Sequence, residues 1–128
     1  MYHRRKRDPA VSEAIAEHRR REDAAPRLRD IAPRLESLRL TFEDVQEEGR
    51  TAVPSYTRPI VVASAPAHFE VRCMEAKCDG RHDLTPQILR GLKDGKDRFG
   101  GQSTCTGMVG DVSCNRTLSY ACEATNGS

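Results

Sequence analysis

The sequence predicts an α+β fold with an N-terminal helical arm, short antiparallel β-strands, and a C-terminal domain that arranges four cysteines around one inserted helix. Three observations carry this prediction. Apolar residues recur with a helical period after residue 8, apolar and polar residues alternate from residue 38, and four cysteines form two pairs, Cys73-x4-Cys78 and Cys105-x8-Cys114. The predicted units are a disordered basic tail (1–8), a helical arm (9–35), a β-hairpin (36–64) and the cysteine domain (65–128).

The arm follows a polar, basic tail that we expect to be disordered. Asp8 can cap a helix and Pro9 can occupy its first position, because the N–H that proline lacks has no intrahelical partner there. A helical stripe is then formed by Val11, Ala14, Ile15 and His18. The pattern predicts a helix over residues 9–23 and a second, shorter helix within residues 25–35, where prolines interrupt the chain.

The segment that follows the arm fits both the two-residue period of a strand and the helical period of a coiled coil. Leu38, Leu40 and Phe42 alternate with polar residues, which is the pattern of a half-buried strand. The same residues also belong to a helical coiled-coil seam, formed by Leu28, Ile31, Leu35, Leu38, Phe42 and Val45. Pro33 lies inside that seam and would break its helix, so we favour a strand over residues 37–45. A turn at residues 47–50 and a partner strand over 56–63 complete a hairpin.

The C-terminal domain reads as a strand, a cysteine turn, a helix and two further strands. Thr85 is the expected N-cap of the helix, with Pro86 at its first position, and Phe99-Gly100-Gly101 is expected to end it. The predicted segments are a strand at 68–73, a cysteine turn at 73–80, and strands at 102–106 and 118–124. The long second cysteine spacing implies a small hairpin through residues 107–111.

The two cysteine pairs have the residue types and close spacing of a structural zinc site. Zn²⁺ prefers four thiolate or imidazole ligands, and a complete set of four leaves no coordination position for a substrate or a water. Glycine lies two residues after Cys78 and after Cys105, where we expect it to reverse the chain at positive φ. The sequence therefore predicts structural Zn²⁺, with disulfides or free thiols as the alternative. The predicted ligands are Cys73, Cys78, Cys105 and Cys114.

Other sulfur and imidazole groups compete for these positions. Cys122 shares the apolar face of an alternating segment (118–122), which favours a buried structural thiol over a ligand. His82 follows the first pair and is an alternative ligand in place of Cys114, although its charged neighbours also fit an exposed turn. His68 is expected to be solvated at the start of a strand, and the histidines of the arm are not assigned as ligands.

Four segments of the cysteine domain carry a family resemblance. They are Phe69-x3-Cys73-x4-Cys78-Asp79-Gly80, Asp83-Leu84-Thr85, Cys105-x-Gly107 and Leu118-x-Tyr120. The pattern resembles the zinc-ribbon superfamily, in which two cysteine-bearing turns clamp small β-hairpins about zinc, and it looks like small uncharacterised bacterial proteins of this type. The likeness spans about residues 66–125 and implies a zinc-ribbon-like domain without implying an activity.

Charge is unevenly distributed along the chain. Residues 1–34 hold ten Lys or Arg against six Asp or Glu, whereas residues 35–50 hold two against five. The basic clusters that can contact phosphates are Arg4, Arg5, Lys6, Arg7, Arg19, Arg20 and Arg21. The competing interpretation is a solvated helix face with pairs such as Glu17 with Arg21.

These observations rank three hypotheses. The leading one is a non-catalytic, zinc-stabilised module that binds another protein as an adaptor, and nucleic-acid binding through the basic arm is the alternative. A metal-dependent or thiol enzyme ranks last, because Glu75 and Cys122 lie in no recognisable catalytic motif. The chain has no secretion signal and no apolar run that would cross a membrane, so a cytoplasmic location is expected, where cysteines favour metal over disulfides.

Overall fold

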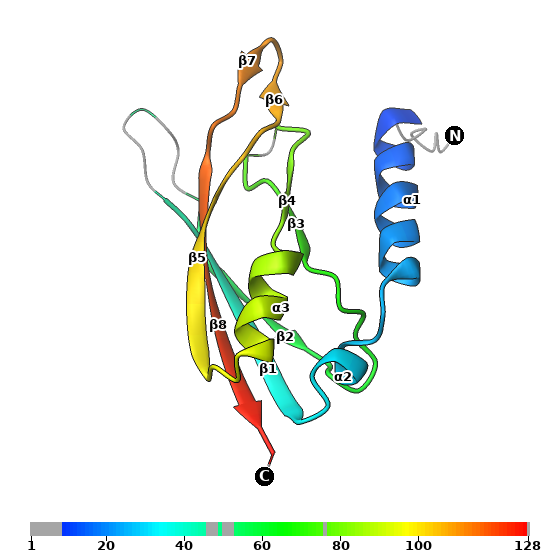
Figure 1. Cartoon of the computed structure of the whole chain (residues 1–128). Helices are drawn as coiled ribbons and strands as arrows, with labels where there is room; N and C mark the ends of the chain where they lie inside the picture. The colour runs from blue at the N-terminus through cyan, green and yellow to red at the C-terminus, as the bar shows by residue number, and fades with distance from the viewer. Residues whose placement is uncertain (1–8, 46–48, 50–52, 76, 128) are drawn as a thin grey trace, which may run out of the picture.

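The structure is a computed structural model, and it describes residues 9–45, 49, 53–75 and 77–127. Three helices and eight strands make up the described part of the chain, shown in Figure 1. The helices are α1 (Pro9–Ala24), α2 (Leu28–Ile31) and α3 (Thr85–Lys93). The strands are β1 (Leu35–Asp44), β2 (Tyr56–Ile60), β3 (Glu70–Arg72), β4 (Arg81–Asp83), β5 (Arg98–Thr104), β6 (Met108–Val109), β7 (Val112–Ser113) and β8 (Thr117–Asn126). The α+β class is therefore confirmed.

The main sheet has the strand order β2-β1-β8-β5, and every pairing in it is antiparallel. Its centre is formed by the two ten-residue strands β1 and β8, in which Leu40 lies opposite Cys122 and Phe42 opposite Tyr120. Two separate two-stranded sheets, β3-β4 and β6-β7, flank the cysteines: Cys73 and Cys78 lie between β3 and β4, and β6-β7 lies between Cys105 and Cys114. The register places alternate residues of both central strands on the same buried face.

The strand interpretation of the ambiguous segment is confirmed, and the coiled-coil seam is wrong. Leu38, Leu40 and Phe42 are 3%, 2% and 1% exposed, while the residues between them are exposed or half-buried. The α2 helix ends at Ile31, ahead of Pro33, so no helix continues into the strand. These residues also fit a helical period, but the strand buries all of their apolar side chains on one face of the sheet, and this favours the strand. The predicted turn at 47–50 falls largely on residues that lie outside the described part of the chain.

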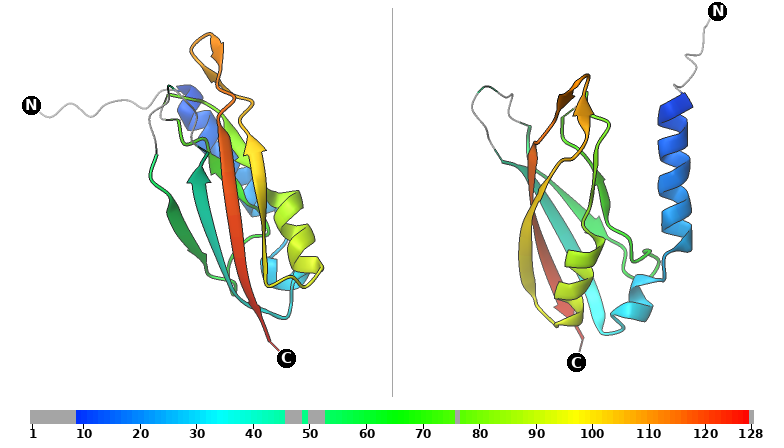
Figure 2. Two further views of the ribbon diagram at one scale, coloured as in Figure 1. Left: turned by 90° about the vertical axis from the view of Figure 1, so that its left-hand side faces the viewer. Right: turned by 45° about the horizontal axis from the view of Figure 1, so that its top comes forward.

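Helix α3 covers the buried face of the sheet (Figure 2). Its apolar stripe places Ile88 and Leu92 in the core, at 0% and 7% exposure. Gly91 faces the ring of Phe99 on β5, and a Cβ at this position would lie 2.4 Å from a carbon of that ring. The helix therefore contains glycine because the Phe99 ring fills the space that a side chain would need, despite the conformational cost of glycine in a helix.

The predicted ends of α3 need correction. The helix begins at Thr85 and its N-cap is Leu84, while the Thr85 hydroxyl accepts a hydrogen bond from the backbone N–H of Phe69 at 2.8 Å. The threonine joins the helix to the preceding segment instead of capping it. The helix ends at Lys93, and Gly95 turns the chain with φ +72°. The Phe99-Gly100-Gly101 segment lies within β5, because these residues pair with β8.

Two of the predicted units, residues 36–64 and residues 65–128, contribute strands to the same sheet. Helix α1 matches the predicted helix of the arm, and the strands of the 36–64 range form one sheet with β5 and β8 of the 65–128 range. The division into independent units stays a prediction, and the basic tail lies outside the described residues. Among the described helices, none combines the length and apolar character needed to cross a membrane.

Candidate metal centre

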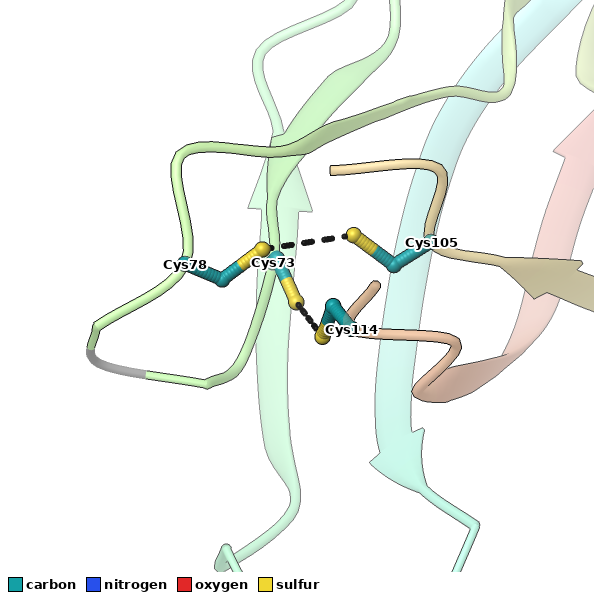
Figure 3. A group of neighbouring side chains, drawn as sticks. All are labelled: Cys73, Cys78, Cys105 and Cys114. Carbon is teal, nitrogen blue, oxygen red and sulfur yellow. Dashed lines mark hydrogen bonds between the residues drawn. The ribbon is translucent and has the colours of Figure 1, made fainter. Parts of the chain in front are cut away.

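The fold brings the four predicted cysteines together at one end of the main sheet (Figure 3). Cys73 directly follows β3 and Cys78 precedes β4, while Cys105 follows β5 and Cys114 follows β7. Their sulfur atoms all lie within 4.8 Å of one another, and each residue is at most 5% exposed. The two predicted pairs, separated in sequence by α3, therefore converge on one buried cluster.

The sulfur separations fit a metal better than a disulfide. The Sγ atoms of Cys73 and Cys114 are 3.7 Å apart, and those of Cys78 and Cys105 are 3.5 Å apart. A tetrahedral ion with metal–sulfur bonds of about 2.3 Å separates its ligands by about 3.8 Å, whereas a disulfide bond measures only about 2.05 Å. None of the five described cysteines forms a disulfide in the structure. The cluster therefore has the size and chemistry to bind one metal ion.

Each cysteine turn directs a backbone N–H at a sulfur. The N–H of Gly80 donates to Cys78 Sγ at 3.2 Å, and the N–H of Gly107 donates to Cys105 Sγ at 3.3 Å. Hydrogen bonds to sulfur stabilise the negatively charged thiolate, which is the form that binds a metal. The two turns thus prepare equivalent ligands although their spacing in the sequence differs.

The role predicted for these two glycines is wrong. Among the described glycines, only Gly49, Gly95 and Gly110 have positive φ. Gly80 and Gly107 are required by close approach instead, since a Cβ at Gly80 would lie 2.4 Å from Cys105 Sγ and a Cβ at Gly107 would lie 2.6 Å from the Cα of Gly80. The two turns pack glycine against glycine, and this contact lets the sulfurs of both pairs meet.

Protonation of the thiols depends on their surroundings. Burial raises the pKa of Cys73, and it raises the pKa of Cys78 to about 11. Burial also acts to raise the pKa of Cys114, but the backbone N–H of Arg116 and the neighbouring sulfurs outweigh it, so this pKa is lowered. Four buried thiolates repel one another unless a cation neutralises them, so binding of a metal would release protons from the site.

A buried arginine connects the centre to the sheet, and sequence reasoning did not identify it. Arg116 is 3% exposed, and its guanidinium donates two hydrogen bonds to the carboxylate of Asp44, at 2.7 and 2.6 Å. It also donates to Glu75 at 2.7 Å, and its carbonyl accepts from the N–H of Cys105 at 2.8 Å. The end of β1, the first cysteine turn and the second are thereby joined through one residue. Glu75 serves as an ion-pair partner in this arrangement.

The long spacing between Cys105 and Cys114 accommodates the predicted hairpin. Strands β6 and β7 pair with each other, and Gly110 turns between them with φ +60°. The carboxylate of Asp79 accepts a hydrogen bond from the N–H of Met108 at 3.0 Å, which joins this hairpin to the first cysteine turn. The second pair is therefore held by a local hairpin, and that hairpin is hydrogen-bonded to the first cysteine turn.

The two alternative ligands lie elsewhere. Cys122 belongs to the main core between the sheet and α3, where burial raises the pKa of its thiol to about 12, and this confirms its prediction as a buried structural thiol. His82 is not one of the residues of the cysteine cluster. Its Nδ1 lies 2.8 Å from the hydroxyl of Ser103 instead. It is also not an exposed turn residue, because it is 3% exposed on β4, and burial lowers its pKa.

The basic arm has a different environment from the one expected for a phosphate-binding surface. Arg20 and Arg21 both contact Glu17, which confirms the predicted pairing along the helix. Arg21 also donates two hydrogen bonds to Glu70 on β3, at 2.9 and 2.8 Å. The predicted cluster of residues 4–7 lies outside the described residues. His68 is half-buried, and its side chain, 9% exposed, lies beside Glu70, so its prediction as a solvated residue is wrong.

Comparison with known protein families, curated proteins and solved structures finds no match to this chain. Membership of the zinc-ribbon superfamily is therefore not confirmed. The geometry supports a coarser statement: four buried cysteines lie within metal-binding distance in an α+β fold.

Proposed function

We propose that the protein is a non-catalytic, zinc-stabilised binding module that acts as a protein-interaction adaptor. The observation that carries this proposal is the set of four buried sulfurs at nearly tetrahedral separations. Tetrahedral sites of four thiolates bind zinc or iron, and zinc is the usual ion of structural sites with no redox role. Four thiolates fill its coordination sphere, so the ion would stabilise the fold without activating a water or a substrate.

The proposed binding surface is an edge of the main sheet. In the described residues the sheet ends at β2 on one side and at β5 on the other. Pro59 lies in β2 and lacks a backbone donor, which makes that edge a poor template for another strand. Strand β5 has no proline, and Gln102 and Thr104 are exposed along it. An extended segment of a partner protein would add to β5 by backbone hydrogen bonds, at an edge that the metal centre holds in place through Cys105.

Nucleic-acid binding through the arm has less support. Arg20 and Arg21 already contact carboxylates, and a phosphate would have to compete with Glu17 and Glu70 for them. Binding that depends on phosphate contacts weakens steeply with salt, so this alternative has a clear signature. A cytoplasmic location belongs to the same proposal, because a reducing compartment keeps thiols available for zinc.

The test combines purification with affinity capture from cells of the source organism. The adaptor proposal predicts zinc-containing protein free of nucleic acid, as judged by the ratio of absorbance at 260 and 280 nm. It also predicts a captured protein that is retained in high salt and lost with Gln102→Lys, which places a charge on the β5 edge. The matched control is Thr57→Lys on the opposite edge strand, which is also exposed. Nucleic acid in the purified protein, or salt-sensitive retention of nucleic acid alone, would contradict the proposal.

A further inference from the structure

A second group of metal-binding residue types lies between α1 and β3, away from the four cysteines. It consists of His18 on α1 together with His68 and Glu70, and one ligand atom from each lies within 4.8 Å of the others. His68 Nε2 is 3.0 Å from Glu70 Oε2, and His18 Nδ1 is 3.6 Å from the same oxygen. Two imidazoles and one carboxylate from distant parts of the chain therefore face a common point.

The contacts of His18 indicate which of its ring nitrogens carries a hydrogen and which carries a lone pair. Its Nε2 contacts the carboxylate of Glu22 one turn later on the same helix. A ring nitrogen that faces a carboxylate carries the hydrogen, so in a neutral ring Nδ1 carries the lone pair. His18 Nδ1 is buried and has no hydrogen-bond partner, and Glu70 Oε2 lies beyond hydrogen-bond distance from it. Two acceptors that face each other at this distance repel one another unless a cation or a proton lies between them.

The arrangement around His18 is typical of metal ligands. A histidine that binds a metal through one ring nitrogen usually donates the other N–H to a carboxylate, which fixes the ring and increases its basicity. Glu22 is placed to accept that N–H. The rings of His18 and His68 are tilted, with centroids 5.7 Å apart, so they are not stacked face to face.

The cluster also borders a small pocket that is partly open to solvent. The pocket has a volume of about 70 Å³, and His18, His68 and Glu70 share its wall with apolar side chains such as Leu40 and Phe42. A water molecule occupies about 30 Å³ in the liquid, so the pocket has room for an ion and one additional ligand. Three protein ligands would leave a coordination position open to this pocket.

The charges nearby limit the affinity of such a site. Glu70 contacts both Arg21 and Arg81, at 2.8 and 2.6 Å. These two guanidinium groups already compensate the negative charge of the carboxylate. The same arginines repel a divalent cation. The site should therefore bind its ion more weakly than four thiolates would.

We propose that His18, His68 and Glu70 form a second metal site that binds a divalent ion of the late first transition series, such as Zn²⁺ or Co²⁺. Imidazole and carboxylate ligands suit these ions. The ion fills the gap between His18 Nδ1 and Glu70 and joins α1 to β3, in addition to the ion pair between Arg21 and Glu70. This site is independent of the adaptor role and of the four cysteines, and either can fail without the other.

The test is a Co²⁺ titration of the full chain after removal of all metal. The first equivalent should produce the intense thiolate-to-cobalt charge-transfer absorption of the cysteine site. A second equivalent should add only weak visible bands, because its ligands are nitrogen and oxygen. We expect saturation at about two ions per chain in the wild type and about one in His68→Gln, which removes the imidazole and keeps a polar side chain beside Glu70. The charge-transfer band serves as an internal check that the variant has folded.

Two further variants make the outcome decisive. His18→Ala removes the second imidazole from a helix position whose side chain is 22% exposed, so it perturbs the core less than a change at His68. His3→Ala removes an imidazole outside the described residues and should retain both equivalents. Saturation of the wild type at one equivalent, or two equivalents in both His18→Ala and His68→Gln, would overturn the proposal.

Discussion

The strongest prediction concerns Arg116, which joins the metal centre to the sheet. The variant Arg116→Met keeps most of the side-chain volume and removes the guanidinium. The side chains of Arg116 and Asp44 are only 4% and 3% exposed, so the aspartate would keep its buried charge without this cation. Removal of one partner from a buried ion pair costs about 3–5 kcal/mol. Since domains are stable by only about 5–15 kcal/mol, this loss would be a large part of the total.

The assay is urea unfolding followed by circular dichroism at a fixed excess of free zinc, so that metal binding contributes equally to every variant. The matched control is Arg39→Met, which removes an arginine from the exposed pair with Glu123. We expect a much smaller change in the free energy of unfolding there, because exposed pairs contribute little. The double variant Asp44→Asn with Arg116→Met should recover part of the loss. Equal effects of Arg116→Met and Arg39→Met would refute the reasoning.

Three other predictions concern the cysteines, the glycine beside them, and the stability of the fold at low pH. Cys73→Ser should lose zinc and unfold the C-terminal half, whereas Cys122→Ser should keep its zinc and lose about 1–3 kcal/mol of stability, as measured by elemental analysis and urea unfolding. Gly80→Ala should weaken Co²⁺ binding in a competition titration, because its Cβ would lie 2.4 Å from a ligand sulfur and overpacking costs about 1–3 kcal/mol. The lowered pKa of Glu70, about 2 against 4.5, contributes stability that is present above pH 4.5 and lost as the pH falls toward 2. Glu70→Gln should therefore flatten that part of the pH profile of unfolding, and Glu123→Gln, at an exposed site, should leave it almost unchanged.

Several elements could be predicted from the sequence because their signals are local. The period of α1, the alternation of Leu38, Leu40 and Phe42, and the cysteine spacing each reflect one surface of one element. The assignment of Cys122 to the core followed from the same alternation in β8. Such patterns are read within a few residues. The structure confirms the alternation of β1 and β8, where one face is buried, and it confirms the helix α1, although none of residues 12–24 is buried.

Other features depend on contacts between distant segments, which no local pattern encodes. The pairing of β1 with β8 joins residues far apart in the chain, and it decides that β1 lies in the centre of the sheet. Gly80 and Gly107 looked like turn glycines, but their role is set by the packing of one cysteine turn on the other. The burial of Arg116 and the partial burial of His68 likewise depend on their contacts with Asp44 and Glu70.

The ends of helices and strands also depend partly on local signals and partly on contacts with distant segments. Phe99-Gly100-Gly101 has the composition of a helix stop, and the preceding helix does end nearby, at Lys93. The glycines themselves lie in β5, where the chain passes against Tyr120 and a Cβ at Gly100 would lie 2.3 Å from the carbonyl oxygen of that residue. Glycine marks a close approach of two backbones here, and composition alone does not separate that role from a turn.

The zinc content of the purified protein tests the central claim most directly. The protein is dialysed against a chelator too weak to remove thiolate-bound zinc, and zinc per chain is then measured by elemental analysis in the wild type and in Cys105→Ser. The account predicts about one tightly held zinc ion per wild-type chain, as expected for one set of four thiolates, and its loss in the variant. A wild-type protein without zinc, or a variant with unchanged zinc content, would contradict the assignment of the four cysteines as a zinc centre.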